Sequence, residues 1–272
     1  MQRKREHGNV RKLVKLILLL QMVCMIEVTS VLKMTLLDTG AYNEYKAGYG
    51  ANMYNSNRDA NTDKDTSIIT MTGLSQAHIP TGCESVSTVT VLNYFGIEIT
   101  PEAFIEDYLT CEPFYRENGV LCGPNPHEAF AGNPFQKASL GCFPRVIVQA
   151  LENMRTQEYE GMEEITFADV SGTGLEQLEE EYLKKGIPVL LWVTMEMKPS
   201  YAGMQYYLED GSCYIWRAGE HCMVLCGYDE NSYYLIDPLA GGEVVCYTRE
   251  LVESRYEEMG EYAVVIVRIA SH

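Results

Sequence analysis

The carboxy-terminal part of the chain, from residue 220 onward, is a series of short β-rich runs separated by turn residues, and this pattern constrains the fold most. The runs are EHCMVLCGYD, SYYLIDP, GGEVVCYT and YAVVIVRI. Apolar runs of this length, bounded by clusters of Asp, Asn, Ser, Gly and Pro, predict strands that pair as hairpins. A single helical segment, LVESRYEEMG, lies before the last run. The end of the chain therefore predicts an antiparallel sheet.

Helical patterns dominate the earlier part of the chain. Val89, Leu92 and Phe95 recur on one face of a helix that starts at Cys83 and stops at Gly96. Thr100 followed by proline predicts the start of a second helix, which extends to about residue 109. Further helices are predicted at 145–154 and 173–185, strands at 68–69, 165–170 and 187–195, and loop-rich chain at 111–145. Helices first and antiparallel strands later predict the α+β class.

The first 30 residues have the character of an export segment. A basic stretch, MQRKREHGNVRK, precedes the apolar run LVKLILLLQMVCMIEV, which is short for a bilayer-spanning helix. We interpret residues 1–30 as a signal peptide or a signal-anchor; a cytosolic protein with an apolar first helix is the third reading. Residues 38–66 are polar and indicate a flexible tether, which we assign to residues 31–66, and we expect residues 67–272 to form the domain. Either of the first two readings places that domain outside the cytoplasmic membrane, secreted or anchored.

The charge of the chain excludes one class of partner. The net charge is -17, although residues 1–30 are net basic, so the domain itself is strongly acidic. An acidic surface repels the phosphate backbone, so we expect no nucleic-acid partner. We expect membrane contact only through the amino-terminal segment. The composition gives no indication of the oligomeric state.

The chain has nine cysteines, and eight of them follow the export segment. Export permits disulfides. Cys111 and Cys122 flank one loop and are the pair we would expect to be bridged. Cys222 and Cys226 lie four residues apart in a probable strand, and no second cysteine pair accompanies them. We therefore interpret these two as small core residues and not as zinc ligands.

Cys83 is a candidate nucleophile, because it opens a helix. Unpaired N–H groups and the helix dipole favour a thiolate at that position, although a buried structural cysteine would also fit there. A nucleophilic cysteine needs a histidine as its base. Of the five histidines, two lie at the chain ends and two in loops, namely His7, His272, His78 and His127. His221 opens a strand, where it is either the base or a hydrogen-bonded core residue.

The strand that follows supplies a partner for this histidine. If the chain turns about Asp229, Asp237 lies opposite His221, and cross-strand partners share a face. A carboxylate there would hold the imidazole in one tautomer; the alternative for Asp237 is a turn cap before Pro238. Gln76, seven residues before Cys83, could donate its amide N–H to an oxyanion, or it could be a solvated loop residue.

Together these residues resemble the papain-like cysteine peptidases. The narrower resemblance is to a stand-alone, exported, C39-like branch related to the double-glycine bacteriocin-processing peptidases. It covers about residues 76–267 and is carried by PTGCESVSTVTVLNYFG, by AFAGNP with GCFPRVIVQALEN, by GIPVLLWVT and by EHCMVLCGYDENSYYLIDPLAGG. In this chain Glu84 follows the cysteine, whereas the double-glycine enzymes commonly have glycine there.

The resemblance implies a papain-like fold and a peptidase that acts on a peptide or protein. Cys83 would be the nucleophile, His221 the base, Asp237 its orienting partner and Gln76 the oxyanion donor, with no cofactor and no metal. Two alternatives remain: a cell-wall amidase or transacylase that uses the same residues, and a non-catalytic binding module that keeps the fold.

Overall fold

The computed structural model describes residues 66–269. The predicted export segment, and all of the predicted tether except its last residue, lie outside the described residues, so both stay predictions. The first strand, β1 (Ser67–Ile68), begins one residue before the strand predicted at 68–69. Within residues 66–269, no helix has the length and apolar character needed to cross a bilayer.

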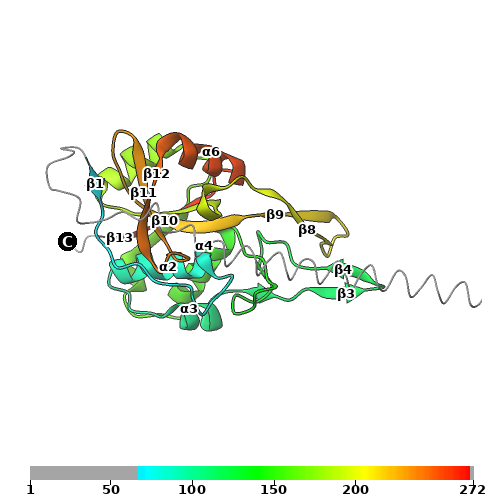
Figure 1. The fold of residues 1–272 in the computed structure, drawn as a ribbon. Helices are drawn as coiled ribbons and strands as arrows, with labels where there is room; N and C mark the ends of the chain where they lie inside the picture. Colours follow the sequence, from blue (N-terminus) through cyan, green and yellow to red (C-terminus); the bar gives the residue numbers. More distant parts are fainter. Residues whose placement is uncertain (1–65, 270–272) are drawn as a thin grey trace, which may run out of the picture. The chain divides into compact units, whose positions relative to one another are not determined.

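A seven-stranded antiparallel sheet forms the centre of the domain (Figure 1). Six strands follow one another in the order β12-β11-β10-β7-β13-β6, and β1 pairs with the end of β10. Their bounds are Glu243–Thr248 for β12, Ser232–Asp237 for β11, Glu220–Tyr228 for β10, Val189–Thr194 for β7, Ala263–Arg268 for β13 and Ile165–Asp169 for β6. All four predicted carboxy-terminal strands are present, and the mixture of helices with an antiparallel sheet confirms the predicted α+β class.

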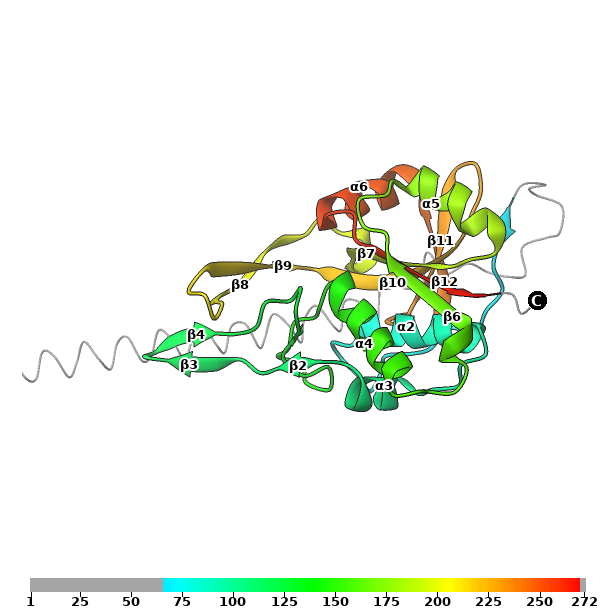
Figure 2. The ribbon, with the colours of Figure 1, turned by 180° about the vertical axis from the view of Figure 1, so that it is seen from behind.

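Helices cover the two faces of this sheet (Figure 2). One face of the sheet is covered by α2 (Cys83–Tyr94), α3 (Pro101–Asp107) and α4 (Pro144–Thr156). The other face is covered by α5 (Leu175–Glu181) and α6 (Arg249–Met259). The expected cap of α3 is present, because the Thr100 side chain accepts the Ala103 N–H. The first ten residues of α2 are all buried, so this helix runs through the core.

The predicted acidic helix at 173–185 is shorter in the structure. The α-helix ends at Glu181, and a 3-10 turn, η3 (Leu183–Lys185), completes the segment. Gly186 then adopts a left-handed conformation with φ of 75° and ends it, as its position predicted. Two further 3-10 turns, η2 (Met162–Glu164) and η4 (Met195–Met197), flank β6 and β7.

The prediction of loop-rich chain at 111–145 was wrong in part. A second sheet joins two hairpins that are far apart in sequence, with strands β3 (Tyr115–Glu117), β4 (Val120–Cys122), β8 (Tyr201–Tyr207) and β9 (Cys213–Ala218). Asn118 and Gly119 both have positive φ, as a two-residue hairpin turn requires, so ENGV was a turn motif that the sequence analysis missed. A parallel pair, β2 (Cys111–Glu112) and β5 (Phe130–Ala131), lies beside it.

The predicted Cys111–Cys122 disulfide is also wrong. All eight cysteines between residues 66 and 269 are free thiols. Cys122 pairs with Tyr115 in the hairpin and Cys111 pairs with Phe130, so the two cysteines belong to different sheets. Cys222 and Cys226 are fully buried in β10, in agreement with their predicted role as small core residues.

The core between the sheet and α2, α3 and α4 provides a first prediction. Ile147 on α4 is fully buried in this core, whereas Ile215 on β9 is 54% exposed. We expect Ile147→Ala to lower the free energy of unfolding by about 2–5 kcal/mol, because it removes buried methyl groups and leaves a cavity. The matched change Ile215→Ala should stay within about 0.5 kcal/mol of the parent. Urea unfolding followed by circular dichroism measures both, and equal losses would contradict the assigned core.

Candidate active site

Cys83 is the first residue of α2 and is almost fully buried. Gly82 precedes it as the N-cap, and a Cβ atom at Gly82 would lie 2.4 Å from the Ile79 side chain. Glycine is therefore needed for the chain to enter the helix so closely. The expected position of Cys83, at a helix start behind a tight turn, is confirmed.

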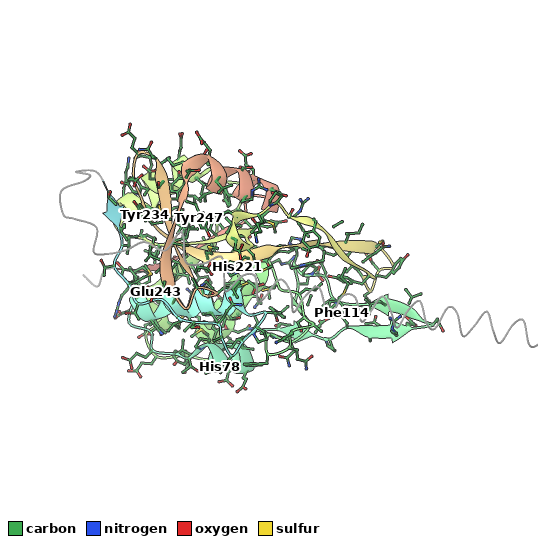
Figure 3. All side chains as sticks on the ribbon, in the orientation of Figure 1. His78, Phe114, His221, Tyr234, Glu243 and Tyr247 are labelled. Carbon is green, nitrogen blue, oxygen red and sulfur yellow. The ribbon has the colours of Figure 1, made fainter. Side chains whose placement is uncertain are left out.

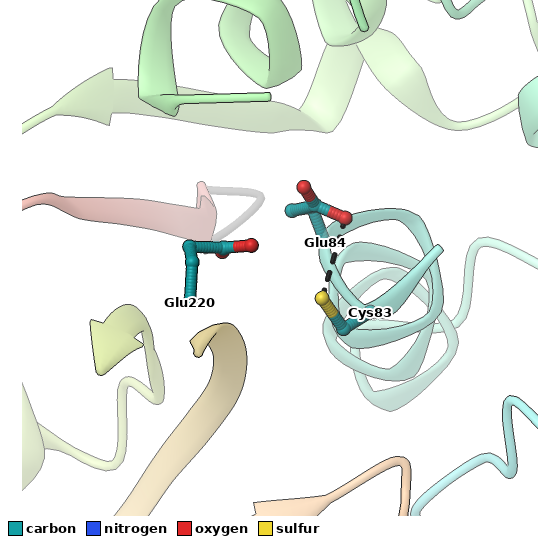
Figure 4. Close-up of side chains that lie close together, drawn as sticks. All are labelled: Cys83, Glu84 and Glu220. Atoms are coloured by element: carbon teal, nitrogen blue, oxygen red, sulfur yellow. Dashed lines mark hydrogen bonds between the residues drawn. The ribbon is translucent and has the colours of Figure 1, made fainter. Parts of the chain in front are cut away.

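Two carboxyl groups lie beside the thiol. The Cys83 Sγ donates to Glu84 Oε2 over 3.4 Å, and Glu220, the first residue of β10, lies close to both (Figure 4). Burial, together with the charges of Glu84 and Glu220, raises the pKa of the Cys83 thiol well above its usual value. Cys83 is therefore a neutral thiol in this structure, in spite of its place at a helix start.

The two acids are themselves shifted by burial. Burial raises the pKa of Glu84 to about 7, although its Oε1 accepts the Cys142 N–H over 2.7 Å. Burial and the neighbouring Glu84 raise the pKa of Glu220 as well. The sequence analysis missed both residues as part of a site. No local pattern marked them, because an acid in the first turn of a helix or at the start of a strand is commonplace. Their burial, which is rare for an acid without a role, is visible only in the structure.

His221 and Asp237 form the expected pair. His221 Nε2 lies 2.7 Å from Asp237 Oδ1, and both side chains are buried. Asp237 Oδ1 also accepts the Leu239 N–H over 2.8 Å, so the alternative role as a turn cap holds too. Burial lowers the pKa of His221 to about 3, which makes the imidazole neutral. A carboxylate only accepts, so the proton sits on Nε2 and Nδ1 carries the lone pair.

The hairpin register differs from the predicted one. Val224 pairs with Ile236, and continuing this register places Asp237 beside Met223 instead of opposite His221. The turn is closed between Asp229 and Ser232 and β10 has an irregularity after Leu225, so the chain folds back later than expected. Asp237 reaches His221 diagonally, because residues two apart on a strand share a face.

Gln76 is buried and lies beside the end of β11. Its backbone N–H donates to the Pro238 carbonyl over 3.0 Å, and its side-chain Nε2 donates to the Pro80 carbonyl over 3.4 Å. The alternative of a solvated glutamine is therefore wrong. These bonds tie the loop that leads into α2 to the residue after Asp237.

The other histidines lie elsewhere. His78 is exposed and far from His221 (Figure 3). His127 stacks on Phe143 with 4.6 Å between ring centroids, and burial lowers its pKa. We interpret His127 as a packing residue.

In the structure, the Cys83 thiol is not hydrogen-bonded to the His221 imidazole. Successive side chains of a strand point to opposite faces, and Cys222 packs in the core with α2 and Trp192. Glu220 shares that face, whereas His221 pairs with Val193 and points to the other face. Within residues 66–269, the thiol's side-chain hydrogen bond is to Glu84 and not to His221. The thiol thus faces the two acids on one side of β10, and His221 lies on the other side.

Comparisons with known proteins agree on the fold. A model of the Peptidase_C39 like family matches residues 68–264. The uncharacterized protein YvpB of Bacillus subtilis (strain 168) is 27% identical over 203 residues, which are 75% of this chain and 76% of YvpB. A crystal structure from Bacillus anthracis, provisionally assigned as a C39-like peptidase, superposes with a TM-score of 0.63 at 24% identity and covers 77% of this chain and 100% of its own.

Proposed function

The chain belongs to the Peptidase_C39 like family, and from this premise we propose that it is an exported cysteine peptidase that hydrolyses a peptide bond in a peptide or protein substrate. The observation that carries the proposal is the buried His221–Asp237 hydrogen bond, on the strand that packs against the start of α2. A neutral imidazole with its Nε2–H bound to a carboxylate presents Nδ1 as a base, which is the state that acyl transfer needs.

The proposed mechanism begins with a turn of the Cys83 side chain. In the structure the thiol bonds to Glu84 and His221 lies on the other face of β10, so substrate binding must rearrange both the thiol and the start of β10 to bring sulfur and imidazole together. His221 Nδ1 then takes the thiol proton as the sulfur attacks the peptide carbonyl. Deprotonation at that moment, and not a standing thiolate–imidazolium pair, agrees with the raised pKa of Cys83 and the lowered pKa of His221.

The remaining steps follow from the same residues. The negative oxygen of the tetrahedral intermediate would accept from the Gln76 side-chain amide and the Cys83 backbone N–H. Collapse of this intermediate breaks the C–N bond, and the imidazolium returns its proton to the leaving amine. Water, deprotonated by His221, then hydrolyses the thioester and regenerates the thiol. Asp237 keeps the imidazole in one tautomer throughout and stabilises the imidazolium.

The proposal can be tested before the substrate is identified. The full chain is incubated with a mixed-sequence peptide library in water enriched in ¹⁸O, and new peptide ends are identified by mass spectrometry. Hydrolysis predicts new carboxyl ends that carry the heavy oxygen, whereas transacylation predicts joined peptides without it. Purified peptidoglycan in a parallel sample would reveal a cell-wall amidase. New ends that also form in Cys83→Ala protein would contradict the proposal.

Gln76 provides a prediction specific to the oxyanion. We expect Gln76→Ala to lower kcat by about 10²–10³-fold with a smaller change in KM, because the amide would act mainly on the charge formed in the transition state. Gln205→Ala, at an exposed position on β8, is the matched control and should keep full activity. A loss confined to KM would assign Gln76 to substrate binding instead, and circular dichroism checks the fold of both variants.

A further inference from the structure

The group formed by Cys83, Glu84 and Glu220 contains more polar atoms than the proposed mechanism uses. One donor atom from each of the three residues lies within 4.8 Å of the other two. Figure 4 shows the Glu220 carboxyl group directed from β10 toward Glu84 at the start of α2. Glu220 is 8% exposed, and its Oε1 is buried without a hydrogen-bond partner among residues 66–269.

Within residues 66–269, these acids lack a compensating cation. Among the described residues, none of the ion pairs includes Glu84 or Glu220. Both Glu84 oxygens already accept, from the Cys142 N–H and from the Cys83 thiol, and neither bond reaches Glu220. A buried carboxylate without a partner is costly, so a bound cation would stabilise this arrangement.

We propose that Cys83, Glu84 and Glu220 bind a zinc ion that blocks the nucleophile. One thiolate and two carboxylate oxygens suit zinc, which accepts sulfur and oxygen at about 2.0–2.3 Å in a tetrahedral site, with water as a fourth ligand. A sulfur donor disfavours magnesium and calcium, which prefer oxygen alone. The donors need only small side-chain movements, since they already face one point from a helix start and a strand end.

Binding would convert the thiol to a zinc thiolate. The S–H bond breaks, a Zn–S bond forms and the proton passes to solvent, with no change of oxidation state. The sulfur is then held on the face of β10 that carries Glu220, away from His221. Inhibition by zinc therefore rests on the proposed peptidase function, whereas binding of the ion does not.

The test uses reduced, metal-free full-length protein and cobalt(II) as a spectroscopic probe. We expect one equivalent of cobalt to give thiolate charge-transfer absorption and tetrahedral ligand-field bands, both displaced by zinc. Cys83→Ser should remove the charge-transfer absorption. Glu220→Gln should weaken the zinc affinity by about tenfold or more, as disruption of a metal's ligand environment does. Exposed Glu209→Gln is the matched control and should bind like the parent.

The His221→Ala variant separates this site from a simple cysteine–histidine site. We expect it to keep the zinc affinity of the parent. Absence of the cobalt bands, or an affinity unchanged in Glu220→Gln, would overturn the proposal, and so would a loss in His221→Ala as large as that in Glu220→Gln. If Glu220→Gln does not fold, Glu220→Asp provides the same comparison with a shorter carboxylate. Cobalt binding in a chain that cleaves no peptide would leave the metal site standing and contradict only the peptidase function.

Discussion

Replacement of Cys83 by alanine is expected to reduce peptide hydrolysis by a factor on the order of 10⁶, the loss seen when a hydrolytic triad loses its nucleophile. No other cysteine among residues 66–269 can replace it, because none of the other seven is the first residue of a helix. The measurement is kcat/KM on a peptide found in the library screen. The midpoint of thermal unfolding should change little, since the substitution removes only one small side chain, which lies beside Glu84 and Glu220.

Cys226→Ala is the control for this experiment. Cys226 is as fully buried as Cys83, and its thiol donates to the Tyr234 carbonyl on the neighbouring strand. Its replacement removes a similar volume from the same core but should leave kcat/KM within about threefold of the parent, since it is far from the proposed chemistry. Full activity in Cys83→Ala would end the peptidase proposal. Loss of the folded state in Cys83→Ala, but not in Cys226→Ala, would make Cys83 a structural residue.

The second large effect is expected at Asp237. Asp237→Asn keeps the shape of the side chain, but its amide can donate to His221 Nε2 and so move the imidazole proton to Nδ1. His221 could then no longer act as a base toward Cys83, and kcat should fall by about 10⁴-fold, as in other triads in which the acid is replaced by its amide. The measurement is kcat with the peptide substrate, together with NMR of the imidazole nitrogens, which reports the tautomer directly.

Asp237→Ala separates orientation from stability. It leaves the Leu239 N–H and the imidazole without their acceptor, so we expect the free energy of unfolding to fall by about 1–3 kcal/mol as well. Asp210→Asn, at an exposed turn, is the matched control and should change neither quantity. An Asp237→Asn variant with parental kcat would show that the hydrogen bond to His221 serves the fold alone.

Much of the central fold could be predicted because its features are local. The cap at Thr100, the glycine stop at Gly186 and the runs that form β10 to β13 depend on neighbouring residues in the chain. The second sheet could not be predicted in the same way. Its two hairpins meet at the Cys122–Tyr207 pair, a contact between distant segments that no local pattern encodes.

The candidate site shows the same difference between features that local sequence encodes and contacts that only packing decides. Local patterns were enough to place Cys83 at a helix start, and His221 and Asp237 on adjoining strands near enough to bond. The side chains of β10 that face Cys83 could not be identified in this way. Almost every residue of β10 is buried, so the run EHCMVLCGY shows no alternation of polar and apolar residues that would reveal its two faces. The packing of α2 against one face places Glu220 beside the thiol and leaves His221 on the other face.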